Sequence, residues 1–424
     1  SSFGASEICS WHVSYSVTIG TAFARRSSHR VRSIASSLKG IEVKIEFATS
    51  GRSTLGVEWE LALVDQDSGD LRQVAQTVLD AVAPPHGGEH PNIRQELLLN
   101  TVEIVTGVCK TVAEAMADLE YGIGLVREVT DPLRVELMCA GTHPFARWHH
   151  QKVTDKERYA TLIDRTQWWG RQMLIYGVHV HVGIEDRAKV LPISRAMMTH
   201  YGHLLALSAS SPFWGGSETG YASNRALMFQ QLPTAGLPFG FDNWEDFEHY
   251  AEGMMKTGVI DSFDEIRWDI RPSPKFGTLE FRMCDGLPSI REVAAVAALT
   301  QCLVEHYSRE IDAGRPTPTM SAWFAQENKW RAARYGMEAI LILNEEGDED
   351  LVTHDLARLI DMLQPVARDL GCLEELLWVN EILEVGASYQ RQRRVAESAN
   401  GALDAVVGAL VAEMRAGRPL LNEA

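Results

Sequence analysis

The stretch LGVEWELALV, residues 55–64, carries two glutamates one residue apart in an otherwise apolar segment. With the two-residue period of a β-strand, one face carries apolar side chains and the other carries Glu58 and Glu60. The apolar face consists of Val57, Trp59, Leu61 and Leu63. Two carboxylates on one pleat repel each other, and half-burying them without a counter-charge is costly. This face must therefore either lie open to water or be covered by something positive.

Four further predicted strands repeat this pattern, with an apolar face and a face of acids, histidines or arginines. They are NTVEIVTG (100–107) with Glu103, GVHVHVG (177–183) with His179 and His181, IRWDIRP (266–272) with Arg267, Asp269 and Arg271, and GTLEFRMCD (277–285) with Glu280 and Arg282. The last two are separated by a Pro-rich turn and predict a hairpin. A solvated face or a surface ion pair would explain any one of these strands alone. Five strands with the same pattern predict one shared functional face.

Helical periodicity alternates with these strands as far as about Cys284, for example at 71–82, 111–129 and 192–210. From Ile290 onward the chain is almost entirely helical in pattern. We therefore expect an α+β fold, with a sheet-rich part at 53–289 and a helical C-terminal third at 290–424. Residues 1–52 are rich in Arg and Ser and have only one acid, Glu7, in the first 40 residues. They resemble a transit-type segment, and we expect a poorly ordered N-terminal extension.

Composition excludes several classes of function. The net charge of −17 argues against nucleic acid as a partner, since phosphate binding needs basic patches. No apolar run approaches the roughly 18 residues of a membrane helix. The six cysteines are scattered without a CxxC pair, which is typical of reduced, mostly buried thiols. We expect a cytoplasmic protein without a membrane or nucleic-acid partner.

The mixture of side chains on the shared face narrows the chemistry. Carboxylates in excess, with histidine in a minority and no cysteine, suit Mg²⁺ or Mn²⁺ rather than structural zinc. Acids that converge with arginines suit phosphoryl transfer, because carboxylates hold the cations while arginine stabilises the transferring group. No Walker-type GxxxxGK[ST] occurs and no GxGxxG follows a strand. A nucleotide would therefore be held through metals and arginines on a sheet.

Seven motifs in order resemble the glutamate–cysteine ligase type 2 family of carboxylate–amine ligases, which are relatives of glutamine synthetase in fold. They are GVEWE, NTVEIVTG, GTHPFA, GVHVHVG, SPFWGGSETGYASNR, DIRPSPKFGTLEFRMCD and ENKWRAARYG, and they run from about Thr54 to the C-terminus. The resemblance implies a glutamine synthetase-like fold, with a curved, mainly antiparallel sheet forming a concave active site. It also implies ATP-dependent amide formation through an acyl phosphate. In the family, the γ-carboxylate of glutamate is joined to the amine of cysteine.

The resemblance also implies roles for individual residues. The metal ligands would be Glu58, Glu60, Glu103, His179, His181 and Glu280. Glu96 would be a catalytic acid near the metals or the amine. Arg282 would face the ATP phosphates, and Arg271 the acid substrate or the transferring phosphoryl group. Tyr221 and Arg225 would bind the amino-acid carboxylate.

Other residues leave two interpretations open. Arg331 and Arg334, on a predicted helix, either bind nucleotide phosphate or belong to an ion-paired helix face. The loop at 141–144 either contacts a ligand or forms a structural turn. Trp168 and Trp169 are expected in the core or an interface rather than as a substrate platform.

Three alternatives to a glutamate–cysteine ligase remain. The first is a ligase of the same mechanism with a different acid or amine. The second is a non-catalytic nucleotide-binding regulator. The third is a metal-dependent amidohydrolase, prompted by the HxH of GVHVHVG, although there the HxH normally closes the first strand of a barrel. The expected partners are small amino-acid substrates, and the apolar C-terminal helices leave room for a homodimer.

Overall fold

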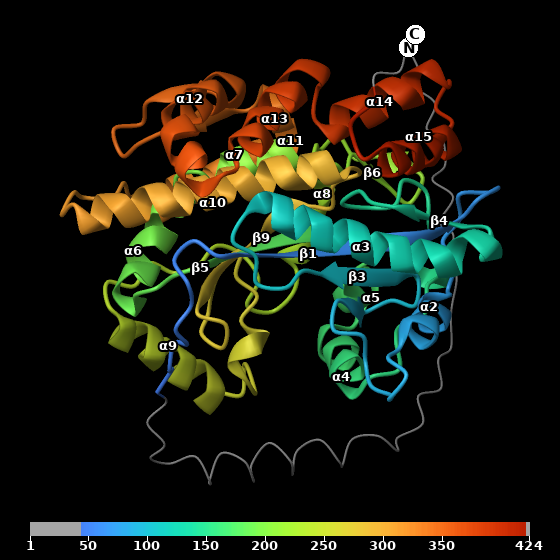
Figure 1. Ribbon diagram of the computed structural model, residues 1–424, viewed down its shortest axis with the longest axis horizontal. Coiled ribbons are helices and arrows are strands. Elements are labelled where there is room, and N and C mark those ends of the chain that lie inside the picture. The colour runs from blue at the N-terminus through green and yellow to red at the C-terminus, as the bar shows by residue number, and fades with distance from the viewer. Residues whose placement is uncertain (1–43, 421–424) are drawn as a thin grey trace, which may run out of the picture.

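The structure is a computed structural model that describes residues 44–420, and it confirms the expected α+β architecture (Figure 1). The strands of the main sheet are β1 Leu55–Asp65, β2 Ile93–Gln95, β3 Thr101–Val105, β4 Val135–Met138, β5 Gly177–Gly183, β8 Ile270–Ser273 and β9 Thr278–Asp285. Two small hairpins are formed by β6 Phe213–Trp214 with β7 Ser217–Glu218, and by β10 Ile340–Ile342 with β11 Glu349–Leu351.

The helices fall into two groups along the chain. Those of the sheet-rich part are α2 Ala75–Val82, α3 Val112–Thr130, α4 Glu157–Thr166, α5 Trp168–Arg171, α6 Arg187–Met198, α7 Tyr201–Ser208, α8 Asn224–Phe229 and α9 Trp244–Lys256. Those of the C-terminal part are α10 Ile290–Asp312, α11 Ala322–Tyr335, α12 Val352–Leu370, α13 Leu373–Val385, α14 Ser388–Ser398 and α15 Leu403–Ala416. No helix among residues 44–420 combines the length and the apolarity needed to cross a membrane.

The main sheet has the strand order β2-β3-β1-β5-β9-β8, with β4 pairing the end of β1, and each of these pairings is antiparallel. The amidohydrolase alternative needs a barrel of parallel strands. The strand that carries HxH, β5, instead lies in the middle of this antiparallel sheet, so the fold argues against that alternative.

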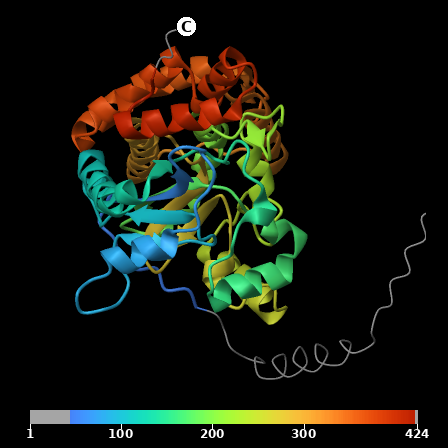
Figure 2. The same cartoon turned by 90° about the vertical axis from the view of Figure 1, so that its right-hand side faces the viewer.

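The apolar face of β1 lies in the core, because Val57, Trp59, Leu61 and Leu63 are fully buried. Helix α10 lies between the sheet and the outer C-terminal helices α12–α15, whereas α4 and α9 lie on the opposite side of the sheet (Figures 1 and 2). The alternation of the strands therefore places their apolar side chains toward α10 and their polar side chains toward α4 and α9.

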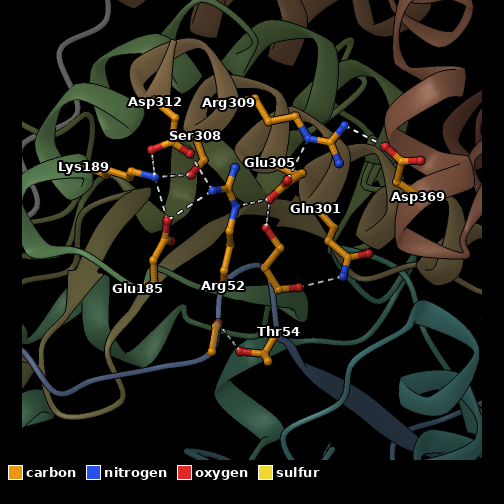
Figure 3. A network of polar contacts seen from close by, with 12 residues as sticks. Arg52, Thr54, Glu185, Lys189, Gln301, Glu305, Ser308, Arg309, Asp312 and Asp369 are labelled. Carbon is orange, nitrogen blue, oxygen red and sulfur yellow. Dashed lines mark hydrogen bonds and ion pairs between the residues drawn. The ribbon is translucent and has the colours of Figure 1, made fainter. Parts of the chain in front are cut away.

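The N-terminal segment 44–52 forms part of the fold. Ile45 is buried and its backbone N donates to Glu248 of α9, while the backbone N of Ala48 donates to the carbonyl of Pro274. Arg52 donates to Glu305 of α10 at 2.9 Å within a larger ion-pair network (Figure 3). The structured part therefore starts before Ser53, the residue at which the sequence analysis expected the folded part to begin. The expectations for residues 1–43 lie outside the described residues.

One prediction about local structure is wrong. The helix expected at 192–210 is two helices, α6 and α7, because the backbone N of Thr199 and of His200 bond to carbonyls three residues back and the turn tightens there. Trp168 and Trp169, expected in the core or an interface, are 58% and 44% exposed and so lie outside the core. Trp168 packs edge-on against Trp148 instead. The five cysteines in the described part are free and buried, as expected.

Candidate active site

The register of the sheet brings the predicted acids and histidines into one row. Glu60 is directly opposite Glu103, Glu58 is opposite His179, and His181 is opposite Glu280. Residues directly opposite each other in an antiparallel pair point to the same face. Since Arg271 of β8 is in turn opposite Glu280, five strands place polar side chains on one surface, as the alternation predicted.

Three sets of ligand atoms on this surface lie within 4.8 Å of one another. They are Glu58 with Glu103 and His179, Glu58 with His181 and Glu280, and Glu60 with Glu96 and Glu103. Glu58 Oε2 lies 3.0 Å from His179 Nδ1, and Glu58 Oε1 lies 3.5 Å from His181 Nε2. All six predicted metal ligands and Glu96 thus belong to one cluster.

The donor atoms fit a hard divalent cation. Carboxylate oxygens dominate, and His181 Nε2 is buried without a hydrogen-bond partner while its Nδ1 lies 3.0 Å from Thr278 Oγ1. An imidazole whose second nitrogen is held in this way is arranged as metal-binding histidines are. Glu280 fits less simply, because its carboxylate already accepts from Arg271 at 2.6 Å and from Arg282.

The electrostatics of the acids point the same way. Burial, with the charge of Glu60, raises the pKa of Glu96 to about 8. Burial and the neighbouring Glu96, Glu58 and Glu60 raise the pKa of Glu103 well above its ordinary value. Burial would also raise the pKa of Glu58, but the neighbouring His179 and His181 hold it well below its ordinary value. Several acids concentrated in a buried site create a strong demand for positive charge.

Arginines supply part of that charge. The Glu280 carboxylate is clamped between Arg271, through Nε at 2.8 Å, and Arg282. Although burial acts in the opposite direction, these arginines lower the pKa of Glu280. Arg225 is 3% exposed, donates to the carbonyl of Arg282 and has an Nε without a hydrogen-bond partner. A Cβ at Gly177 would come within 2.2 Å of Arg225 Nη2, so glycine permits this close approach.

A cavity of about 910 Å³ opens from this surface. On the sheet side it is lined by Glu60, Glu96, His179, Arg225 and Arg282. Its opposite walls come from α4 and from the segment 258–267 after α9, which places it between the sheet and these elements. A separate cavity of about 210 Å³ is lined by Glu58, His181 and Arg94. The acidic cluster therefore lies between two cavities.

Outside the acidic cluster, four predicted site residues do not line the larger cavity. Arg271 lies against Glu280 but does not line it. Arg331 forms ion pairs with Glu327 at 2.9 Å and Glu349 at 2.5 Å, which is the ion-paired helix face left open by the sequence. The guanidinium of Arg334 lies over the Tyr221 ring, 5.7 Å from its centroid, and neither residue lines the cavity.

Asp269 and the 141–144 loop also take structural positions. Asp269 does not share the polar face with Arg271, since its carboxylate is buried against Lys329 at 2.6 Å and Tyr201 at 3.1 Å. It precedes β8, which begins at Ile270, so the strand alternation does not extend to it. His143 is fully buried and bonds only to nearby backbone, so the loop is a structural turn at this residue.

The sequence analysis missed three arginines. Arg94 is opposite Glu103, and Arg158 and Arg165 line the larger cavity from α4. Arg94 is two residues before Glu96 in the sequence, so strand alternation could have grouped them. Arg158 and Arg165 are seven residues apart and share a helix face, but that spacing indicates only an amphipathic helix.

Comparisons with known proteins find matches over most of the chain. A family model described as glutamate–cysteine ligase family 2 matches residues 54–409. A protein of Arthrobacter sp. strain FB24, provisionally named a glutamate–cysteine ligase 2-1, is 60% identical over 380 residues, covering 88% of this chain and 99% of its own. A protein of Mycobacterium tuberculosis strain H37Rv, provisionally named a glutamate–cysteine ligase 2, is 58% identical over 371 residues. The match covers 88% of this chain and 97% of that protein.

Solved structures share the fold at low identity. The chain is similar to a glutamate–cysteine ligase of Francisella tularensis in complex with AMP, with a TM-score of 0.62, 11% identity and coverage of 87% of this chain and 90% of that one. It is also similar to a bifunctional glutathione synthetase from Pasteurella multocida, with a TM-score of 0.61 and 14% identity. This match covers 86% of this chain and 52% of that one. At such identities these two likenesses concern the fold alone.

Proposed function

The chain belongs to the glutamate–cysteine ligase family 2, and we propose that it catalyses the ATP-dependent joining of the γ-carboxylate of glutamate to the amine of cysteine. The observation that carries this proposal is the row of acids, histidines and arginines between two cavities. Family membership supports a carboxylate–amine ligase. The identity of the two substrates, the nucleotide and the cation are the proposed parts.

The proposed reaction has two steps. In the first, an oxygen of the substrate carboxylate attacks the γ-phosphorus of ATP, ADP leaves and an acyl phosphate forms. In the second, the amine attacks the acyl carbon, inorganic phosphate leaves and the nitrogen gives up a proton. Both steps transfer groups whose negative charge must be stabilised in a site that excludes water.

Arg282 is the residue placed to stabilise that charge. It lines the larger cavity while one of its guanidinium nitrogens is held by Glu280, so its orientation is fixed before substrate arrives. Such pre-orientation avoids reorganisation during the reaction. Arg271 does not line the cavity, and we propose that it fixes Glu280, and through Glu280 the position of Arg282.

Two further groups would act on the substrates. Glu96 lies in the cavity wall beside Glu60 and would accept the proton that the attacking nitrogen loses. Glu58, Glu60, Glu103, His179 and His181 would hold Mg²⁺ or Mn²⁺. When bound, the cation would neutralise and align the ATP phosphates.

The direct test is ADP release with Mg²⁺, ATP and glutamate, with and without a panel of amines that includes cysteine. We expect ADP release to rise at least about tenfold when cysteine is present, because the acyl phosphate is consumed only when an amine attacks it. A response to another amine would keep the ligase and change its second substrate. ATP binding without ADP release from any pair would favour the regulator.

A further inference from the structure

The arginines that line the larger cavity are only partly paired with acids. Five arginines line it: Arg158, Arg165, Arg225, Arg267 and Arg282. Arg282 is paired with Glu280, and Arg165 with Glu265 at 3.6 Å. Within residues 44–420, the other three have no carboxylate within 4.0 Å. A cavity lined by unpaired guanidinium groups is suited to a ligand that supplies carboxylates.

Arg267 is an unpaired arginine that is held in place by bonds to the segments around it. It is half-buried, its Nη1 donates to the carbonyl of Glu265 at 3.0 Å, and its backbone N donates to Thr234 Oγ1 at 3.1 Å. Burial lowers the pKa of Arg267; the charge of Glu265 opposes this shift, while the charges of Arg282, Arg165 and Arg271 lower the pKa further. A half-buried cation among other cations is stabilised when an anion binds beside it.

The segment that carries Arg267 also offers negative charge to the same cavity. Asp261 and Asp264 line it, and neither carboxylate has a hydrogen-bond or ion-pair partner in the described part of the chain. A guanidinium and two exposed, free carboxylates that line one cavity complement the carboxylate and the ammonium of an α-amino acid. An inorganic anion or ATP alone would not need the two acids.

We propose that Arg267 binds the α-carboxylate of the acid substrate, with Asp261 and Asp264 facing its ammonium group, an inference that rests on the proposed function. The acid substrate must stay in place through both steps, from acyl phosphate formation to amide formation. On the wall of the cavity opposite the sheet, Arg267 is less exposed than Arg158 of α4, and Arg267 is therefore assigned to the acid substrate. Arg267 thus selects amino acids with a second, reacting carboxylate, which lies toward Arg282.

The test compares two acids and two amines in wild type and Arg267→Gln. The acids are glutamate and 4-aminobutyrate, which keeps the reacting carboxylate and the amine but lacks the α-carboxylate. The amines are cysteine and cysteamine, which lacks the carboxylate of cysteine. Glutamine at position 267 removes the charge and shortens the side chain but keeps a polar N–H donor. Arg368→Gln, on an exposed face of α12, is the matched control.

We expect kcat/KM for glutamate to fall on the order of 100-fold in Arg267→Gln, as expected for removing one member of a buried charge pair. The value for 4-aminobutyrate should stay unchanged, so the preference for glutamate over it disappears. The preference for cysteine over cysteamine should stay as in wild type, and Arg267→Lys should recover part of the loss. Arg368→Gln should behave as wild type throughout.

Other results overturn the proposal and leave the ligase intact. Equal losses for both acids would show a structural role, and a changed cysteine preference would place Arg267 at the amine. If wild type released no ADP with any pair, the proposed function would fail. Calorimetric titration of glutamate would then decide the inference, since equal or absent binding in wild type and Arg267→Gln would overturn it.

Discussion

Glu58 and Glu103 each belong to two of the three sets of ligand atoms, and Glu58 also contacts both His179 and His181. Replacing Glu58 by glutamine removes one negative charge and one metal-type oxygen with little change of volume. We expect Glu58→Gln to lower ADP release by at least about 100-fold, the loss typical of removing a group that stabilises transition-state charge. Enzyme kinetics would measure the loss of ADP release, and calorimetric titration with Mn²⁺ would measure the affinity for the cation.

The matched control for this substitution is Glu128→Gln, since Glu128 is exposed on α3, away from the cluster. It should keep the wild-type ADP release and Mn²⁺ affinity. Wild-type turnover in Glu58→Gln would remove the metal assignment of this residue. A melting temperature close to that of wild type would show that the loss is chemical.

His143 gives a second prediction at the residue scale, concerning stability and pH. Burial lowers the pKa of His143 to about 4, although the bond between its Nε2 and the carbonyl of Gly69 partly opposes the shift. Its Nδ1 accepts from the backbone N of Ala146 at 3.0 Å, so the neutral ring carries its proton on Nε2 and donates it to Gly69.

The direction follows from proton linkage. Between pH 6.5 and about 4 the unfolded chain binds a proton that the folded chain does not, so the stability that His143 contributes is lost as the pH falls through this range. The loss for this one residue is about 3 kcal/mol. His143→Gln should therefore show a shallower decline of unfolding free energy over this range in urea titrations. Parallel declines in the two proteins would refute the assignment.

At the scale of elements, the N-terminal segment is fixed to α10 mainly by one buried acid. Glu305 is 5% exposed and accepts from Ser53 Oγ at 2.6 Å, Arg52 Nε at 2.9 Å and Arg309 Nε at 2.8 Å (Figure 3). Asp312 also pairs with Arg52, but its side chain is 45% exposed. Burial weakens solvent screening, so the same kind of contact stabilises more at Glu305.

We therefore expect Glu305→Gln to cost about 2 kcal/mol of unfolding free energy, as for lost hydrogen bonds to charged groups. Asp312→Asn should cost less than about 1 kcal/mol, as for an exposed ion pair. Urea unfolding of both variants would measure the difference. Equal costs would mean that the anchor of the segment is spread over the whole network rather than centred on Glu305.

The elements differ in how well sequence could predict them, for a physical reason. Strands β1, β3, β5 and β9 were predicted because one face is apolar core and the other carries the site, so alternation reports both. Asp269 was misplaced because alternation stops where β8 begins. The break between α6 and α7 was missed because both helices are largely buried, and their apolar pattern continues through Thr199 and His200.

The site shows the same limit. Residues on paired strands could be grouped from sequence, since the sheet fixes their common face. Arg267, Arg158 and Arg165 reach the cavity from segments outside the sheet, and only tertiary packing decides where those segments lie. Arg331 and Arg334 lie on a helix whose partners could not be known, and they pack against Glu349 and Tyr221 instead.

At the scale of the molecule, the helical C-terminal third is joined to the rest by buried charge as well as by apolar packing. Arg391 of α14 is 4% exposed and donates to Glu292 of α10 at 2.7 Å and to Glu413 of α15 at 2.7 Å. The segment RQRR at 391–394 gave no sign of this, because a basic run is usually a solvated helix end. Helix α10 is thus fixed on one side by the sheet and on the other by α14 and α15.

This architecture places a cluster of acids within a chain whose net charge is −17, so a bound cation should stabilise the whole fold. A ligand that binds only the folded state adds RT ln(1 + [L]/Kd), or about 2.7 kcal/mol when free Mg²⁺ is about 100 times Kd. We expect Mg²⁺ to raise the melting temperature by a few degrees and EDTA to reverse the rise.

The rise should be absent in Glu58→Gln and present in Glu128→Gln. NaCl at the same ionic strength should not reproduce it, because screening acts on all exposed charges and is not saturated by a site. An equal rise with NaCl, or in Glu58→Gln, would mean that the acids respond to ionic strength and hold no specific cation.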